Sequence, residues 1–270
     1  MRLFFFTSRL LKGLYAYRGF VLSSVKREFQ LKYRNSALGS IWAVLNPLAM
    51  ILVYTVIFSE VMQARLPGVN STFAYSIYLC AGMLTWGFFA EIASRTQNVF
   101  LEYANLLKKL SFPRISLPVI VILNAGLNFS IVFTLFTLFL ILSGSFPGWV
   151  FLGIFPVLTI QVMFAVGLGM ILGVLNVFFR DVGQFFGIFV QFWFWLTPIV
   201  YPAEILPEKA RALLALNPML PLVQAYQGVL VKGQWPEWSS LVAVALIGLA
   251  LCILGLHLFR KHAGEIVDEL

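Results

Sequence analysis

Residues 115–179 read ISLPVIVILNAGLNFSIVFTLFTLFLILSGSFPGWVFLGIFPVLTIQVMFAVGLGMILGVLNVFF, and none of these 65 residues is Asp, Glu, Lys or Arg. A helix that crosses a membrane needs about 20 apolar residues, because each residue adds about 1.5 Å along its axis. The stretch is therefore long enough for two crossings. The turn-forming sequence SGSFPG at 143–148 divides it. We predict a tight helical hairpin, with one span over 116–142 and the next over 150–178.

The composition supports a membrane protein. The chain of 270 residues is 60% hydrophobic and only 11% charged, and its mean hydropathy is +0.91. A soluble domain has about 25% charged residues. The net charge of +8 is best explained by membrane topology and by anionic lipid headgroups. Because the basic residues are scattered among apolar stretches, a nucleic-acid partner is not expected.

Four further apolar stretches complete the predicted architecture. They extend outward from the hairpin, and we place spans over 38–58, 73–93, 182–201 and 241–259. Residues 1–35 mix Phe and Leu with Arg and Lys, which is typical of an amphipathic helix lying in the membrane interface. Residues 202–238 are apolar but rich in proline, which predicts short reentrant helices that break at Asn217-Pro218. The fold class is therefore an all-α membrane protein with two parts, an interface segment over 1–35 and a transmembrane domain over 36–270.

The distribution of basic residues predicts the orientation. Six spans place both termini on the same side, and 15 of the 19 Lys and Arg residues fall on that side. Positively charged loops stay in the cytoplasm. We therefore expect a multi-pass protein of a bacterial inner membrane with both termini in the cytoplasm.

The sequence offers no chemistry for an enzyme. No charged residue falls at the middle of a predicted span, where ion-coupled transporters usually need one. There is no metal-ligand spacing, no phosphate-binding lysine loop and no nucleophile beside a base. We expect neither a bound metal nor a bound cofactor on this chain.

The segment 103–113, YANLLKKLSFP, is a short basic stretch between two apolar ones. Leu106, Leu107 and Leu110 share one face of a short helix, and Pro113 ends it. Two interpretations stand. The first is an ordinary cytoplasmic loop with an interfacial helix, which is common in membrane proteins. The second is a surface helix that passes force from a motor subunit to the membrane part.

Three blocks of sequence carry a family resemblance. The first runs from Arg27-Glu28 through Tyr33-Arg34 to Leu38-Gly39, Trp42 and Asn46-Pro47; the second is Asn105 to Lys109 with Phe112-Pro113-Arg114; the third is Asn176, Phe179 to Val182, Pro198, Tyr201 and Asn217-Pro218. In this order and spacing they resemble the permease subunits of ATP-driven polysaccharide exporters, the O-antigen, capsule and teichoic-acid group of the ABC-2 superfamily. The family often has Asp at the position of Glu28, so this chain departs from it mildly there.

The resemblance implies a set of partners. It implies a homodimer of this subunit together with two copies of a separate ATPase, which would bind the ATP and Mg²⁺. It also implies a lipid-linked polysaccharide, of the undecaprenyl type, as cargo. The segment 103–113 would then be the coupling helix that contacts the ATPase, through Leu106, Leu107, Lys108, Lys109, Phe112, Pro113 and Arg114.

The resemblance also suggests roles for three other groups. The first group, Arg27, Lys32, Tyr33 and Arg34, would bind the lipid-linked pyrophosphate, because one arginine can bind two phosphate oxygens at once. Anchoring to lipid headgroups explains these residues equally well. Arg180 and Asp181 would form an ion pair or helix cap between two spans, in a structural or coupling role. Most aromatic residues of the fifth span are expected to serve in packing or lipid contact. Four aromatic residues of this span and its end are candidates for the polymer path: Phe189, Phe192, Trp193 and Tyr201.

The function that follows is the channel-forming subunit of an ATP-driven exporter of lipid-linked, O-antigen-like polysaccharide. Two alternatives remain open. One is an exporter of the same family that carries a drug or a lipid. The other is a membrane component of a polysaccharide polymerase, which needs carboxylates that reach the substrate.

Overall fold

The computed structural model describes residues 15–34, 36–61, 66, 72–109 and 114–269. Within these ranges the chain is helical and has no β-strand. Five of the described helical segments are long and apolar enough to cross a membrane: Gly39–Ser59, Ala74–Glu102, Ser116–Leu142, Gly148–Phe178 and Trp238–Lys261. The prediction of an all-α membrane protein is therefore confirmed.

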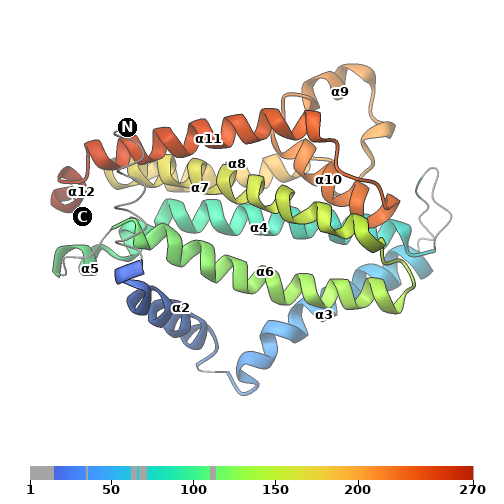
Figure 1. Ribbon diagram of the computed structural model, residues 1–270, viewed down its shortest axis with the longest axis horizontal. Helices are drawn as coiled ribbons and strands as arrows, with labels where there is room; N and C mark the ends of the chain where they lie inside the picture. Colours follow the sequence, from blue (N-terminus) through green and yellow to red (C-terminus); the bar gives the residue numbers. More distant parts are fainter. Residues whose placement is uncertain (1–14, 35, 62–65, 67–71, 110–113, 270) are drawn as a thin grey trace.

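Helix α4 (Ala74–Glu102) forms the centre of the bundle. In Figure 1 it lies between α6 (Ser116–Leu142) and α7 (Ile154–Phe178), and it also packs against α10 (Met219–Lys232). Its side chains Phe89, Ile92 and Phe100 are fully buried. Helix α11 (Trp238–Lys261) packs along α7 on the far side from α4.

Small residues of α7 let its neighbours approach closely. A Cβ atom added at Gly169 would lie 2.7 Å from the Cβ of Thr96 in α4 and 2.9 Å from the carbonyl oxygen of Ala93. On the opposite side, a Cβ at Gly167 would lie 2.7 Å from the backbone nitrogen of Cys252 in α11. Helices in lipid associate mainly through such close packing. The glycines of α7 therefore hold the three central helices together.

The helices of the expected hairpin are α6 and the unit made of η3 (Gly148–Gly153) and α7. Gly144 and Gly148, in the turn between them, have φ angles of +67° and +64°, which glycine adopts without strain. At the opposite end of the bundle, α5 (Ala104–Lys109) lies near α12 (Glu265–Glu269) and the start of α2 (Arg18–Tyr33) (Figure 1).

Two helices differ in extent from the predicted spans. Helix α4 continues to Glu102, nine residues past the predicted end at 93, because tertiary partners accommodate its charged residues. Helix α8 (Asp181–Trp195) ends before the predicted 201, since Thr197 precedes Pro198 and proline disfavours helical geometry in the residue before it. At 15 residues α8 is about 22 Å long, less than the ~30 Å of a bilayer core.

The proline-rich region contains a sharp bend. Helix α9 (Glu208–Leu214) and α10 meet at 101°, and Asn217-Pro218 lies at the bend, as the sequence indicated. The side chain of Asn217 fixes this bend, since its Oδ1 accepts hydrogen bonds from Trp193 Nε1 at 2.8 Å and from the Met219 backbone nitrogen at 3.0 Å. The reentrant position of these helices in the membrane remains a prediction.

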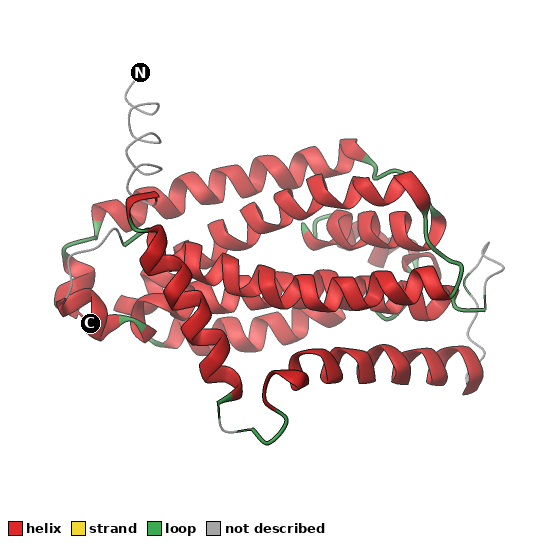
Figure 2. Ribbon diagram, turned by 60° about the horizontal axis from the view of Figure 1, so that its bottom comes forward, coloured by secondary structure: helices red, strands yellow, loops and turns green. Residues whose placement is uncertain are grey.

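The first two described helices lie at the edge of the bundle. Helix α2 runs obliquely to the long helices (Figures 1 and 2). In α2, Val21 and Val25 are buried, whereas Leu22 and Leu31 are exposed. Residues 1–14 of the predicted interface segment lie outside the described residues, so its amphipathic character stays a prediction. Helix α3 (Trp42–Thr55) buries only Ile51.

The close approach of α7 to α4 can be tested by substitution. Gly169→Leu places a side chain where Thr96 and the Ala93 carbonyl already lie, so it should destabilise the purified protein by about 1–3 kcal/mol. The thermal unfolding midpoint in detergent should fall by roughly 3–10 °C. The matched control is Gly126→Leu, because a Cβ at Gly126 meets nothing within 4 Å. Equal midpoints for the two variants would contradict this packing.

Candidate functional site: a polar cavity between α2, α4 and α6

The carboxylate of Glu28 in α2 connects three other parts of the chain. Arg95 of α4 donates from Nη2 to Glu28 Oε2, and the Tyr103 hydroxyl donates to Oε1. Asn124 of α6 donates from Nδ2 to Oε2 at 2.7 Å. Tyr103 lies between α4 and α5, so a single side chain of α2 links α4, α6 and the start of α5.

Partial burial makes this connection important. The side chains of Glu28 and Arg95 are 23% and 29% exposed. A charge withdrawn from water is costly unless opposite charge and hydrogen-bond donors surround it. Burial and the hydrogen bond to Glu28 raise the pKa of Tyr103 above its ordinary value, so its hydroxyl stays protonated and remains a donor.

A cavity of about 640 Å³ opens beside this cluster. Its lining carries three cations and three carboxylates: Arg27, Lys32, Arg95, Glu28, Glu91 and Glu102. Arg95 is held by Glu28 and also lies 3.8 Å from Glu91. Arg27 and Lys32 form no ion pair with any residue in the described ranges, so their charges are available to an anion.

Two neighbouring cavities share lining residues with this one. Glu91 and Asn128 border it, and they also border two neighbouring cavities of about 360 and 380 Å³. Asn128 donates from Nδ2 to Glu91 Oε1 at 2.6 Å, which keeps this junction in place. The third cavity is mainly apolar, and its lining includes Met50, Ile51, Met83, Leu84, Phe129 and Val132. The polar cavity at α2 thus lies next to an apolar cavity between α3, α4 and α6.

The structure places the expected phosphate-binding residues in different positions. Arg27 and Lys32 line the 640 Å³ cavity, and Tyr33 lines the adjoining cavity together with Lys32. Arg34 follows the end of α2, is exposed and borders none of the three cavities. The structure therefore brings together three of the four residues.

The expected coupling residues are also divided. Leu106 lines the cavity, and Lys108 is exposed. Leu107 is buried within the subunit, in a cluster with Val177, Phe259 and Ile266. The side chain of Leu107 is therefore not available to contact a partner protein. This corrects the prediction that the leucines of this segment form one apolar face for the ATPase.

The end of this segment is only partly described. Lys109 ends α5, but its side chain, Phe112 and Pro113 lie outside the described part of the structure. Arg114 donates from Nη1 to the backbone carbonyl of Ala263, just before α12. This contact links Arg114, just before α6, to the turn that precedes α12.

Among the described residues Arg180 and Asp181 form no ion pair and no side-chain cap, so their structural or coupling role stays a prediction. Asn176 connects the two helices instead. Its Oδ1 accepts from the Gly183 backbone nitrogen at 3.0 Å, and its Nδ2 donates to Asn98 Oδ1 at 3.1 Å. A neutral amide makes this connection because it supplies both a donor and an acceptor.

The candidate path residues divide into exposed and buried groups. Phe189 and Phe192 of α8 are 42% and 66% exposed. Trp193 is 9% exposed, packs edge-on against Trp86 at 5.8 Å between ring centroids, and uses its indole N–H on Asn217. Tyr201 donates its hydroxyl to the Trp195 carbonyl. We therefore reassign Trp193 to the core of the subunit.

Several residues of the site were not singled out from the sequence: Glu91, Arg95, Glu102, Asn124 and Asn128. A signal was available for four of them. Glu91 and Arg95 are four residues apart, and so are Asn124 and Asn128, which places each pair on one face of its helix. Polar pairs with this spacing in apolar helices indicate a shared polar contact.

This arrangement defines a multi-pass membrane protein with a charged cavity at one end of its bundle. Residues 20–231 match the family described as ABC-2 type transporter, and the chain belongs to that family of transport permeases. It is 32% identical to an O-antigen export system permease protein RfbA of Myxococcus xanthus, over 97% of this chain and 99% of the relative.

Two more distant relatives are similar over most of their length. An O-antigen export system permease protein RfbA of Klebsiella pneumoniae is 29% identical over 87% of this chain and 88% of its own. A polysialic acid transport protein KpsM of Escherichia coli is 23% identical over 87% of this chain and 90% of its own.

The Glu28 cluster can be tested by a double-mutant cycle. Glu28→Ala leaves the Arg95 guanidinium partly buried without its carboxylate, so it should destabilise the protein by roughly 1–2 kcal/mol. Removing both groups with Glu28→Ala and Arg95→Ala should cost less than the sum of the two single changes. The measurement is thermal or denaturant unfolding in detergent. Simple additivity would show that the two side chains do not interact.

Proposed function

We propose that this chain is the transmembrane subunit of an ATP-driven exporter that moves lipid-linked polysaccharide across the bacterial inner membrane. The observation that carries the proposal is the set of adjacent cavities between α2, α3, α4 and α6, in which a charged cavity shares Glu91 and Asn128 with an apolar one. A lipid-linked polymer has the same division, with a pyrophosphate next to a long apolar chain. The names of the relatives support polysaccharide as the cargo class.

The charged cavity would hold the pyrophosphate. Arg95 is engaged by Glu28, so the binding charges are those of Arg27 and Lys32, on the exposed side of α2. Arginine contacts two phosphate oxygens with its planar fork, and lysine adds a point charge. The apolar third cavity would accept the first part of the carrier lipid.

The energy would come from a partner ATPase that binds ATP and Mg²⁺. Exposed Lys108 on α5 is available to acids of that partner, although an exposed ion pair contributes only about 0–1 kcal/mol. Tyr103 begins the loop into α5 and donates to Glu28, so a displacement of α5 would reach α2 through this hydrogen bond. In this proposal the α5 end of the bundle, with both termini, faces the cytoplasm.

A second copy of the chain would complete the path. Helix α3 is packed on few neighbours, and α8 exposes Phe189 and Phe192. A homodimer with two ATPase copies would cover part of this surface and leave aromatic rings beside the polymer. The sugars would then slide past Phe189, Phe192 and Tyr201.

An exporter of a lipid or a drug is the second candidate. The apolar third cavity favours it, because that cavity would also accept a lipid without any sugar. Purified transporter distinguishes the two: lipid-linked polymer should stimulate ATP hydrolysis, whereas the same carrier lipid without sugars should not.

The coupling role of α5 gives a direct test. Replacing Lys108, Lys109 and Phe112 together by Ala should reduce polymer-stimulated ATP hydrolysis and co-purification of the ATPase, because these groups contact it in the proposal. The control is Lys209→Ala with Arg211→Ala, in α9 at the other end of the bundle (Figure 1). Normal hydrolysis and normal co-purification in the triple variant would remove the coupling role.

If Arg27 binds the phosphate, charge reversal at Arg27 and at Arg34 should affect export differently. Arg27→Glu puts a negative charge into the cavity, so export should fall about tenfold while assembly with the ATPase stays normal. Arg34→Glu is the matched control, because Arg34 lies outside the cavity. The measurement is polymer at the cell surface per assembled complex. Unchanged export in Arg27→Glu would leave Arg27 as a headgroup anchor only.

A further inference from the structure

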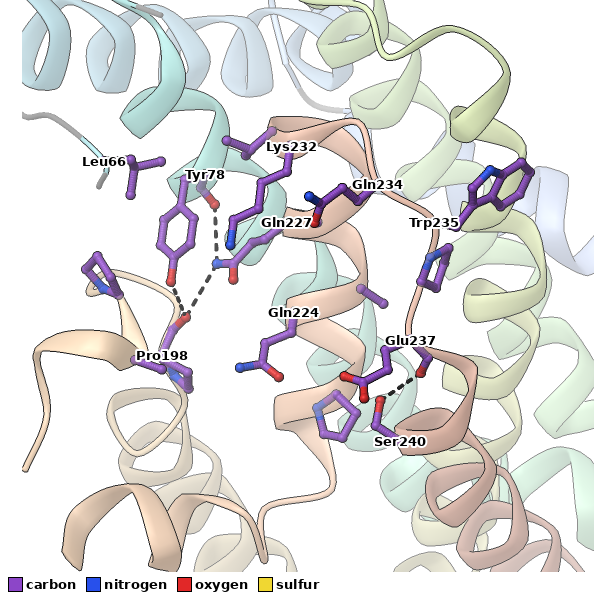
Figure 3. Close-up of a pocket in the computed structure, with 17 residues that line it drawn as sticks. Leu66, Tyr78, Pro198, Gln224, Gln227, Lys232, Gln234, Trp235, Glu237 and Ser240 are labelled. Atoms are coloured by element: carbon purple, nitrogen blue, oxygen red, sulfur yellow. Dashed lines mark hydrogen bonds between the residues drawn. The ribbon is translucent and has the colours of Figure 1, made fainter. Parts of the chain in front are cut away.

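A second polar cavity is shown in Figure 3. It is lined by α10, whose C-terminal part lies at the end of the bundle opposite α5 (Figure 1). It has a volume of about 350 Å³ and lies between the segment 198–203, α10, and the segment that leads into α11. Small-molecule sites in proteins have volumes of about 300–1,000 Å³, so the cavity can accept one or two sugar rings. None of the residues predicted to couple to the ATPase or to bind phosphate lines it.

One wall of the cavity is fixed by hydrogen bonds. Gln227 is 5% exposed, and its Nε2 donates to the carbonyl oxygens of Tyr78 at 3.5 Å and Pro198 at 3.4 Å. The Tyr78 hydroxyl donates to Pro198 and Tyr201 carbonyls, each at 3.1 Å. Figure 3 shows the Tyr78, Gln227 and Pro198 contacts as a connected set. This wall is therefore formed before any ligand arrives.

Other polar groups around the same space remain available. The side chains of Gln224, Lys232 and Gln234 make no hydrogen bond or ion pair with residues in the described ranges, and all three are exposed (Figure 3). Within the described ranges, the carboxylate of Glu237 accepts one hydrogen bond, from Ser239 at 3.3 Å, and the Glu237 backbone carbonyl accepts another from Ser240 Oγ at 2.8 Å. Each carboxamide offers both donors and acceptors, as a sugar hydroxyl does.

The remaining lining suits the apolar faces of sugar rings. Four prolines contribute to it: Pro198, Pro202, Pro221 and Pro236. Proline rings are rigid and carry no N–H, so they present flat carbon surfaces. Lys232 and Glu237 are the charged residues in the lining and they balance each other, so a phosphate gains no net attraction. In the α2 cavity, by contrast, the charges of Arg27 and Lys32 favour a phosphate.

The position of the cavity fits a hydrated ligand. Trp149 and Trp235 lie at this end of the bundle and are 84% and 57% exposed. Tryptophan concentrates where a membrane meets water. The cavity therefore lies beside the membrane surface on the side away from α5.

We propose that this cavity binds saccharide units of the exported polymer as they leave the membrane. The inference rests on the proposed function, because it takes the polymer as cargo. It adds a site for sugars alone, distinct from the α2 cavity that would hold the pyrophosphate. Gln224 and Gln234 would hydrogen-bond the hydroxyl groups, and the prolines would contact the C–H faces.

The test uses the transporter assembled with its ATPase in lipid nanodiscs. The probe is the polysaccharide of the source cells, released from its carrier by mild acid, cut to short oligosaccharides and labelled with a fluorophore. Binding is measured by fluorescence anisotropy. Gln224→Ala with Gln234→Ala should weaken binding roughly tenfold, because two hydrogen-bonding groups are lost. The control is Gln30→Ala, an exposed glutamine of α2 at the other end.

Basal ATP hydrolysis without polymer should be the same in the three proteins, which shows that they are folded and assembled. Equal oligosaccharide affinity in the double variant and the wild type would overturn the proposal. Loss of co-purifying phospholipid with unchanged oligosaccharide affinity would identify the cavity as a lipid-headgroup site instead. If the wild-type transporter exports no polymer in reconstituted vesicles, the proposed function itself fails, whatever this cavity binds.

Discussion

The partly buried carboxylate of Glu28 must keep its donors, and the arrangement of the α2 end of the bundle depends on this constraint. Arg95, Tyr103 and Asn124 come from three different segments, and each donates to the same side chain. Separating any of them from Glu28 exposes an unpaired charge or donor to a poorly solvated cavity. Helix α2 and the start of α5 are therefore expected to move together.

The two ends of the bundle have different chemistry. The α2 end has a cavity lined by cations without an ion-pair partner in the described ranges, next to an apolar cavity, and this pair suits an amphiphilic anion. The other end has a charge-balanced cavity of amides and prolines, which suits neutral sugars. A polymer that enters by its pyrophosphate and leaves by its sugars meets these surfaces in that order. The close packing of α4, α7 and α11 between the two ends gives both cavities a rigid frame.

The sequence predicted the parts of the fold that depend on local composition. The absence of charge over 115–179 and the turn at 143–148 were enough to locate α6 and α7. The extent of α4 was missed because Glu91 and Arg95 look like the end of a span, whereas Asn128 and Glu28 stabilise them from other helices. The position of Trp193 was missed for a related reason: only the fold shows which face of α8 meets α4. In the candidate site, the sequence supplied Arg27, Lys32, Tyr33 and Leu106, but it did not single out Glu91, Arg95, Glu102, Asn124 or Asn128.

The central claim is that α5 and α2 move as one unit when the ATPase binds ATP. Spin labels at Lys26 in α2 and Lys108 in α5 measure it directly, in the assembled transporter without nucleotide and with ATP trapped. The account predicts that the Lys26-to-Lys108 distance within a subunit stays the same, while the distance between the two Lys108 labels of the proposed dimer changes. A Lys26-to-Lys108 distance that changes as much as the distance across the dimer would contradict it.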